Sequence, residues 1–322
     1  MTGTWPDLQL AAERPFGELS RQSLARQART GLSVRVARGG YEEAAVWEQL
    51  TPRERHIVRA RAMTATGRQL PVLSHFTAAA VHGLPFLGSW PDEIHTIIGK
   101  STGGRSRSGV VKHAIRLDDA DVVEVDGLRV TSLARTVIDV AACLPAVGGV
   151  IAADRALLLD RFGRRPPLLR QHQLLELWER MLPFQGHTRA RDVILFADGR
   201  AESPLESASR VNMRIVGVPQ PALQQSYHDA QGWIGDSDFS WEDYDLIGEA
   251  DGDAKYLDAG LRNGRSAEQV VLDEKIREDR LRALPRRVTR WRWSVGISAD
   301  RLWAHLSAAG LPCGRTWAPP PL

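Results

Sequence analysis

The sequence predicts a mixed α/β protein with more than one domain, and three observations lead to this expectation. Its 322 residues exceed the roughly 100–200 residues of one typical domain. Runs of alternating or branched apolar residues, typical of strands, recur between longer segments with helical periodicity and capping residues. The composition, with 43% hydrophobic and 25% charged residues, is that of a globular chain and excludes disordered and fibrous classes.

Four segments are expected along the chain. They are a winged helix-turn-helix domain over residues 7–50, an α/β region over 51–142, a helical connector over 143–195 and a further α/β domain over 196–310. Two cysteines cannot build a disulfide framework or a Cys-rich zinc site, which fits a reducing compartment. Because no stretch is typical of a signal peptide or a membrane helix, we expect a cytoplasmic protein with no membrane partner.

Residues 7–50 have the pattern of a basic helix followed by a basic wing. A helix is expected from the N-cap Ser20 to Arg29, then an alternating strand over 32–38 and a Gly39-Gly40 turn. In the winged-helix arrangement the helix enters the major groove and the wing contacts backbone phosphates. The arginines expected to contact DNA are Arg21, Arg26, Arg29, Arg35 and Arg38. The alternative is a solvated basic helix without a ligand.

The α/β region contains a second basic segment. Strand-like runs at 93–98 and 109–113 flank a stretch rich in Gly, Ser and Arg, which includes Arg105 and Arg107. Such a loop can lie along a phosphate backbone, so these two arginines are also expected to contact DNA. A solvated hairpin tip is an equally good explanation.

Carboxylates gather on two neighbouring strands of the last domain. Strands are expected over 233–241 and 245–251, joined by a short acidic turn. Alternation places Asp238 on one face of the first strand and Glu249 with Asp251 on one face of the second, so a hairpin brings Asp238 and Glu249 together. Asp and Glu oxygens are the ligands that Mg²⁺ and Mn²⁺ prefer. The sequence therefore predicts a metal site here, with a hydrated acidic hairpin as the alternative.

Lysine is scarce enough to make each position informative, because only four of the 42 basic residues are lysines. Lys255 follows the second strand closely. Its ammonium group can hold an attacking water or offset charge that develops on a phosphate. A surface counter-charge to the acidic strands is the alternative.

These residues resemble the PD-(D/E)XK nuclease superfamily, and the closest branch is that of the very-short-patch repair endonucleases. The resemblance rests on Asp238, on the run Glu249-Ala-Asp251-Gly, and on Lys255 with the tyrosine after it. It implies a restriction-endonuclease-like α/β core and a DNA endonuclease that uses Mg²⁺ or Mn²⁺, with Asp238 and Glu249 as metal ligands. The lysine of the family stands two residues after the second acid, where this chain has Asp251, so Lys255 would be a displaced lysine.

The resemblance also implies a helix that supplies Glu206, or Glu202 one turn earlier. Ser203 and Glu206 have the spacing of a capping box, which explains the glutamate without catalysis. Further along, an Arg-rich helix over 273–284 and a strand over 286–293 would complete the core. The arginines of this strand expected near DNA are Arg287 and Arg290. An edge strand with its tryptophans in the core is the alternative.

Residues 10–145 resemble AbiEi-type antitoxins of type IV toxin–antitoxin systems. The matching segments are the one that ends at Tyr41 and the blocks 73–85 and 130–136. This resemblance implies a DNA-binding repressor with a cognate toxin or other protein partner.

Three hypotheses follow from the sequence. The leading one is a DNA-binding protein whose last domain is a Mg²⁺-dependent endonuclease, with Asp238 and Glu249 holding the metal, Glu206 or Asp251 assisting, and Lys255 positioning or polarising. The second is a repressor or antitoxin with a catalytically degenerate nuclease-like domain. The third is an interaction protein with no nucleic-acid role.

Overall fold

The chain is a mixed α/β protein, which confirms the predicted class. The computed structural model describes residues 8–10, 21–67, 70–98, 109–161, 163–251 and 267–314. It forms two compact units, each made of two stretches of chain: the first is Met1–Cys143 with His172–Ala190, and the second is Leu144–Gln171 with Arg191–Leu322. The connector expected over 143–195 is divided between them. No helix within the described ranges is long and apolar enough to cross a bilayer.

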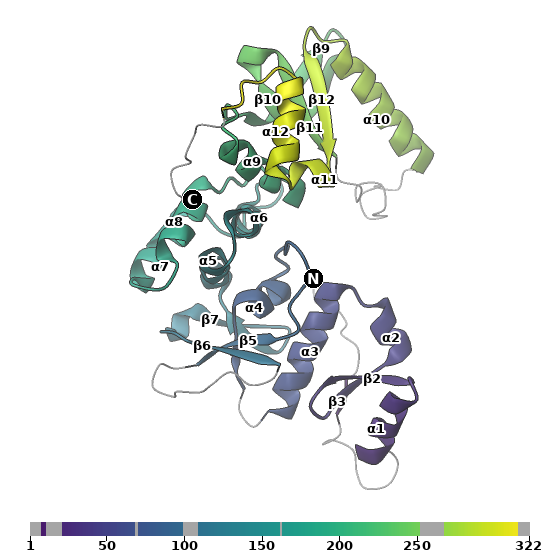
Figure 1. Cartoon of the computed structure of the whole chain (residues 1–322), viewed down its shortest axis with the longest axis vertical. Coiled ribbons are helices and arrows are strands. Elements are labelled where there is room, and N and C mark those ends of the chain that lie inside the picture. Colours follow the sequence, from purple (N-terminus) through teal and green to yellow (C-terminus); the bar gives the residue numbers. More distant parts are fainter. Residues whose placement is uncertain are drawn as a thin grey trace. The chain divides into compact units, whose positions relative to one another are not determined.

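The first unit begins with a helix and a three-stranded sheet (Figure 1). Their bounds are α1, Arg21–Arg29; β1, Gln9–Leu10; β2, Ser33–Ala37; and β3, Gly40–Glu43, in the order β1-β3-β2. The expected basic helix and the two strands expected after it, which pair antiparallel and are called the wing below, are therefore present. Two adjacent glycines shape the turn for different reasons: Gly39 has a left-handed φ of +80°, and a Cβ on Gly40 would lie only 2.8 Å from the Cβ of Ala62.

Two helices follow the wing, α2 over Ala44–Gln49 and α3 over Pro52–Thr66. The capping box expected at the start of α3 is formed. The Glu54 N–H donates to Thr51 Oγ1, and the Thr51 N–H donates to the Glu54 carboxylate at 2.8 Å. Val58 and Ala62 of α3 pack with Val36 of β2 in a small core, which holds the wing against the helix.

The rest of the first unit is a five-stranded mixed sheet packed with helices (Figure 1). In the order β6-β5-β4-β8-β7, the strands are β4, Val72–Leu73; β5, Ile94–Ile98; β6, Val110–Ala114; β7, Val122–Val125; and β8, Leu128–Thr131. The helices are α4, His75–His82; α5, Leu133–Cys143; and α7, Gln171–Met181. Ile57 of α3, Leu73 of β4 and Val130 of β8 lie in a core that also contains Ala78 and Ala80 of α4.

The interpretation of the second basic segment as a hairpin tip is wrong. β5 and β6 pair in parallel, from Ile94 with Val110 to Ile98 with Ala114. A hairpin joins antiparallel strands, whereas parallel strands require the chain to cross back along the sheet. The segment between them, with Arg105 and Arg107, lies outside the described residues.

The second unit is built around a four-stranded sheet. Its strands are β9, Ala222–Asp229; β10, Gly232–Trp241; β11, Leu246–Asp251; and β12, Arg287–Arg292, in the order β12-β11-β10-β9. The helices are α6, Ala146–Leu157; α8, His187–Phe196, which begins in the first unit; α9, Pro204–Ile215; α10, Ala267–Arg282; α11, Trp293–Gly296; and α12, Ala299–Ala308. β9, β10 and β11 are antiparallel, and β12 returns parallel to β11 after α10.

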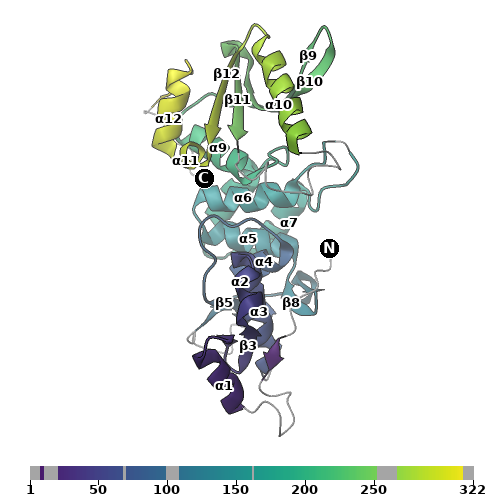
Figure 2. The same ribbon diagram turned by 90° about the vertical axis from the view of Figure 1, so that its right-hand side faces the viewer.

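The two faces of this sheet carry different layers. In Figure 2, α10 lies on one side of β11 and β12, and α11 and α12 lie on the other. Phe239 and Trp291 belong to the core on the α12 side. Ile247 packs with Leu281 of α10 on the opposite side. Because side chains alternate along a strand, Asp238 next to Phe239 belongs to the α10 face.

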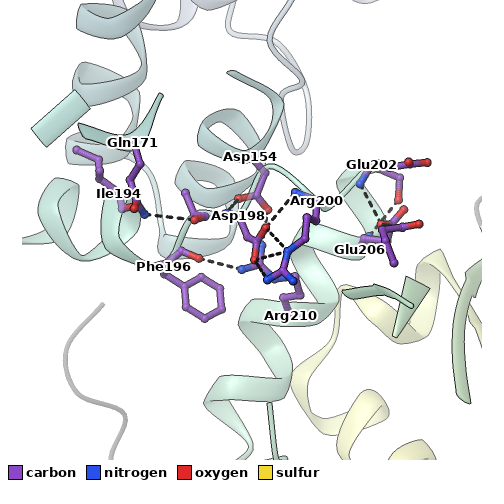
Figure 3. A network of polar contacts seen from close by, with 12 residues as sticks. Asp154, Gln171, Ile194, Phe196, Asp198, Arg200, Glu202, Glu206 and Arg210 are labelled. Carbon is purple, nitrogen blue, oxygen red and sulfur yellow. Dashed lines mark hydrogen bonds and ion pairs between the residues drawn. The ribbon is translucent and has the colours of Figure 1, made fainter. Parts of the chain in front are cut away.

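A buried polar network fixes α9 within the second unit (Figure 3). Arg210 of α9 donates to Asp154 of α6 at 2.8 Å and to the Phe196 carbonyl at 2.9 Å. The other Asp154 oxygen accepts from the Asp198 N–H at 2.7 Å. A charged pair that satisfies its hydrogen bonds in this way tolerates burial, and it sets the position of the helix that begins at Pro204.

Candidate functional site

Asp238 and Glu249 meet on the α10 face of the sheet. β10 and β11 pair up to Phe239 with Gly248, so Asp238 stands opposite Glu249 one position further along. Both residues are buried, with exposed fractions of 8% and 5%. The Ala250 N–H donates to Asp238 Oδ2 at 2.7 Å, which holds this carboxylate against β11. The structure thus brings together the two acids expected from the hairpin.

Glu249 has one partnered and one unpartnered carboxylate oxygen. Arg277 Nη2 donates to Glu249 Oε2 at 2.9 Å. Oε1 is buried and has no hydrogen-bond partner among the described residues. Burial raises the pKa of Glu249, the hydrogen bond from Arg277 opposes this, and the nearby charge of Asp238 adds to it. Glu249 is therefore a desolvated acid whose charge is only partly compensated.

The sequence did not point to Arg277. Besides Glu249, its guanidinium reaches the Asp236 carbonyl, with Nη1 at 3.5 Å from the oxygen. One signal was available: Arg277 precedes the fully buried Leu281 by four residues, and residues four apart share a helix face. Helical periodicity on α10 would have placed this arginine over the strands.

Asp251 takes part in an ion-pair group at the end of β11. Its Oδ2 lies 3.7 Å from Arg290 Nη1, which is also 3.5 Å from Glu278 Oε2 of α10. Arg290, expected near DNA, is thus held between β11 and α10, with 20% of its side chain exposed. Lys255 lies outside the described residues.

Glu206 is almost fully buried at the start of α9, with 2% exposed. The capping box expected there is only half formed. The Glu206 N–H donates to Ser203 Oγ at 3.1 Å, but the Glu206 carboxylate accepts from the Glu202 N–H at 2.9 Å instead of from Ser203 (Figure 3). It also accepts from Gln224 Nε2 at 3.0 Å, so it ties α9 to β9. Glu202 itself remains half exposed and lies 3.8 Å from Arg161.

The arginines of α1 and the wing are the most open of the expected DNA contacts. Arg26, Arg29, Arg35 and Arg38 are exposed, and none of them forms an ion pair with another described residue. The side chain of Arg21 lies outside the described part of the chain. Arg287 of β12 is exposed as well, but it donates to the Ala309 and Tyr244 carbonyls at 2.5 and 3.0 Å, which occupies its guanidinium.

Comparisons with known proteins point to relatives rather than to an activity. No model of a known protein family matches the sequence. The chain is 31% identical over 231 residues to the uncharacterized proteins MT2308 and Rv2248 of Mycobacterium tuberculosis, strains CDC 1551 and H37Rv, covering 72% of this chain and 78% of each relative. The chain belongs to their family.

Asp238 and Glu249 are the two carboxylates of this family member that meet at the expected metal site. Within the described residues, no three His, Cys, Asp or Glu side chains are grouped so as to hold a metal ion. Asp238 and Glu249 are therefore a two-carboxylate arrangement beside Arg277. Such an arrangement suits a cation that completes its shell with water and phosphate oxygens.

Proposed function

We propose that the second unit is a divalent-metal-dependent DNA phosphodiesterase with Asp238 and Glu249 as its metal ligands. The observation that carries this proposal is the buried Glu249 Oε1, which has no hydrogen-bond partner among the described residues. A buried acceptor without a partner costs about 1–3 kcal/mol, and more when it is charged. A cation beside Asp238 would remove that cost.

The residues present fit Mg²⁺ or Mn²⁺. Hard divalent cations take oxygen ligands, and Mg²⁺ is commonly bound by one or two carboxylates plus substrate phosphate. When bound, such an ion lowers the pKa of a coordinated water and offsets charge on the phosphate. The protein's own contribution is positional, because the Ala250 N–H orients Asp238. Arg277 pairs with Glu249 Oε2 and leaves Oε1 for the cation. We also propose that Glu206 or Asp251 assists at the metal and that Lys255 positions or polarises.

The order of elements supports the same proposal. A Glu-bearing helix, a strand hairpin with two acids, a further helix and a last strand follow one another as α9, β10 with β11, α10 and β12. This is the order that the resemblance to the PD-(D/E)XK nucleases implies. The two cysteines are free thiols, which agrees with the reducing cytoplasm proposed for this protein.

The test is cleavage of DNA by the purified full chain. Supercoiled, linear, single-stranded and mismatched DNA would be incubated with Mg²⁺ or Mn²⁺ and with a chelator. We expect metal-dependent nicking that falls at least about a hundredfold in Asp238→Asn and Glu249→Gln, because each removes a ligand charge. The exposed Asp300→Asn in the same unit is the matched control. Nicking that survives both site variants would overturn the assignment.

A second function is favoured by different observations. We propose, as the alternative, a DNA-binding repressor or antitoxin whose nuclease-like unit is inactive. Arg277 already neutralises part of the Glu249 charge, and Asp251 stands where the lysine is expected. The exposed Arg26, Arg29, Arg35 and Arg38 would bind phosphates and bases without a metal.

Duplex binding in a chelator separates the two functions. Arg26→Gln with Arg29→Gln should weaken binding about tenfold or more and reduce its salt dependence, because two phosphate contacts are lost. Exposed Arg129→Gln on β8 is the matched control. If the double variant binds DNA as tightly as the wild type, the repressor proposal fails.

A further inference from the structure

The first unit contains a cavity of about 660 Å³ that is lined entirely by residues of that unit. It opens between the end of β6, the end of α5 and the stretch from α7 to the start of α8. Cavities of roughly 300–1,000 Å³ are the size that takes a small organic ligand. The proposed functions make no use of it.

One wall is a set of hydrogen-bonded histidines. The rings of His75 and His113 stack in parallel, with centroids 3.5 Å apart and planes 11° apart. His95 lies behind them, with Nδ1 2.9 Å from His113 Nε2. Burial lowers the pKa of His75 to about 2, and it also lowers the pKa of His113. At neutral pH this wall is an uncharged, flat surface with hydrogen-bonding edges.

The lining also contains charged side chains that already pair with one another. Arg135 is buried with 3% exposed, and it bonds Asp139 at 3.0 Å and lies 3.5 Å from Asp121. At the edge, Arg116 pairs with Asp118 at 3.1 Å. These groups line the cavity, but each of them already forms an ion pair with another residue of the lining.

Two arginines of the lining form no ion pair with another described residue. Arg180 of α7 and Arg189 of α8 are exposed, and neither forms an ion pair with a described residue. Arg189 donates to the Ala142 carbonyl at 3.2 Å, which holds its guanidinium at the cavity. Guanidinium groups recognise phosphate oxygens by paired, charge-assisted hydrogen bonds.

The remaining wall is apolar. Leu177, Met181, Pro183 and Phe184 line it, on the same stretch of chain that carries the two arginines. Gly186 makes this placement possible, because its φ is +80° and a Cβ there would lie 2.5 Å from the Ala142 carbonyl oxygen. A lining that combines apolar side chains with a histidine stack is suited to a planar ring, and the two arginines of the same lining are suited to an anion.

We propose that this cavity binds a nucleoside phosphate, with the base between the apolar wall and the His75–His113 stack and the phosphate on Arg180 and Arg189. The proposal depends on both the two unpaired positive charges and the apolar and aromatic lining. A simple anion would leave the apolar wall empty, and an uncharged ring would leave the two guanidinium groups without an anionic partner.

Calorimetric titration of the full chain with AMP, GMP, CMP and UMP tests the proposal. We expect at least one of them to bind, and to bind more tightly than either inorganic phosphate or its own nucleoside. Arg180→Gln and Arg189→Gln should each raise its Kd about tenfold, which is the loss expected for a charge-assisted hydrogen bond. Arg129→Gln, on the exposed face of β8, should leave the Kd unchanged.

Each other outcome counts against the proposal. No nucleoside monophosphate binding at millimolar concentration would overturn it, as would a Kd that both arginine variants share with the wild type. Phosphate alone binding as tightly as the nucleotides would show an anion site without a base pocket. Because Arg189 also bonds Ala142, circular dichroism of each variant would verify folding, and Arg180→Gln provides the test free of that bond.

Discussion

Two sets of buried carboxylates in this protein are compensated to different degrees. In the first unit, Arg135 lies between Asp121 and Asp139 and bonds both Asp139 oxygens, at 3.0 and 3.2 Å. In the second unit, Arg277 reaches Glu249 and leaves Oε1 of the same side chain without a partner among the described residues. The first set is matched within the fold, and the second is not.

The difference teaches which set is structural. The buried Asp154 of the second unit is also fully engaged, by Arg210, the Asp198 N–H and the Ser207 hydroxyl. The unit that holds Glu249 therefore contains a fully engaged carboxylate, Asp154, and two carboxylates with a buried oxygen that has no hydrogen-bond partner among the described residues, Asp192 and Glu249. At Glu249 this oxygen belongs to an acid that stands opposite a second buried acid, Asp238, and such a pair is a candidate for completion by a ligand.

The largest effect should come from breaking the matched set. Arg135→Met leaves Asp121 and Asp139 buried without a cation, so we expect the free energy of unfolding to fall by about 3–5 kcal/mol. Urea denaturation followed by circular dichroism measures it, with exposed Arg129→Met as control. A loss below about 1 kcal/mol would mean that the set is not structural.

Acid should weaken the first unit through its histidines. Burial lowers the pKa of His75 to about 2 and that of His95 to about 4, from an ordinary value of 6.5. The unfolded chain takes up these protons near pH 6.5 and the folded chain only near pH 4 and below, so stability falls as the pH drops through this window. Asp139, with its pKa raised by burial to about 6, acts in the opposite direction below that pH.

A histidine double variant isolates this effect. His75→Gln with His95→Gln should flatten the fall in unfolding free energy between pH 7 and pH 4, whereas the exposed His228→Gln should not. Urea denaturation at several pH values provides the comparison. An unchanged slope in the double variant would assign the pH dependence to other groups.

A smaller effect is expected when Glu249 loses its ion pair with Arg277. This prediction rests on the proposed phosphodiesterase activity and concerns its metal requirement. Arg277→Gln removes a cation beside the metal ligands and relieves about 1 kcal/mol of repulsion, so the Mn²⁺ concentration for half-maximal nicking should fall about fivefold. Arg280→Gln, one turn along α10 and paired with Asp229, is the matched control. A higher Mn²⁺ requirement would mean that Arg277 supports the site by holding Glu249 in place.

The smallest expected effect is that of Glu249→Gln on stability. Because the pKa of Glu249 is raised in the folded protein, its contribution to the free energy of unfolding is fully present below the ordinary pKa of 4.5. That contribution is lost as the pH rises through the folded pKa. A neutral amide avoids this loss, so the variant should stay within about 1 kcal/mol of the wild type and gain relative to it from pH 4 to pH 7. A loss comparable to that of Arg135→Met would remove the contrast between the two sets.

The local elements of the site could be predicted because their signals are local. Alternation gave β10 and β11 and placed Asp238 and Glu249 on one face, and the register confirms that placement. Capping residues gave the starts of α3 and α9. The alternating pattern likewise marked β12, although only Trp291 of its two tryptophans is buried, while Trp293 begins α11 with 39% exposed.

What the sequence did not predict depends on partners far along the chain. β9 was missed because its sequence, Ala-Leu-Gln-Gln-Ser-Tyr-His-Asp, has no β-branched residue, and it forms only by pairing with β10 as an edge strand. The parallel pairing of β5 with β6 carries no local signal either. Arg277 and the cavity of the first unit arise from packing between elements.

The parallel return of β12 has a consequence for how the protein is made. Glu249 emerges from the ribosome before α10 and β12. The cations that pair with the acids of β11 come from those later elements, since Arg277 pairs with Glu249 and Arg290 with Asp251. Until they dock, the hairpin acids face water and repel one another. The site is therefore assembled late, by non-local pairing, and incomplete chains lack it.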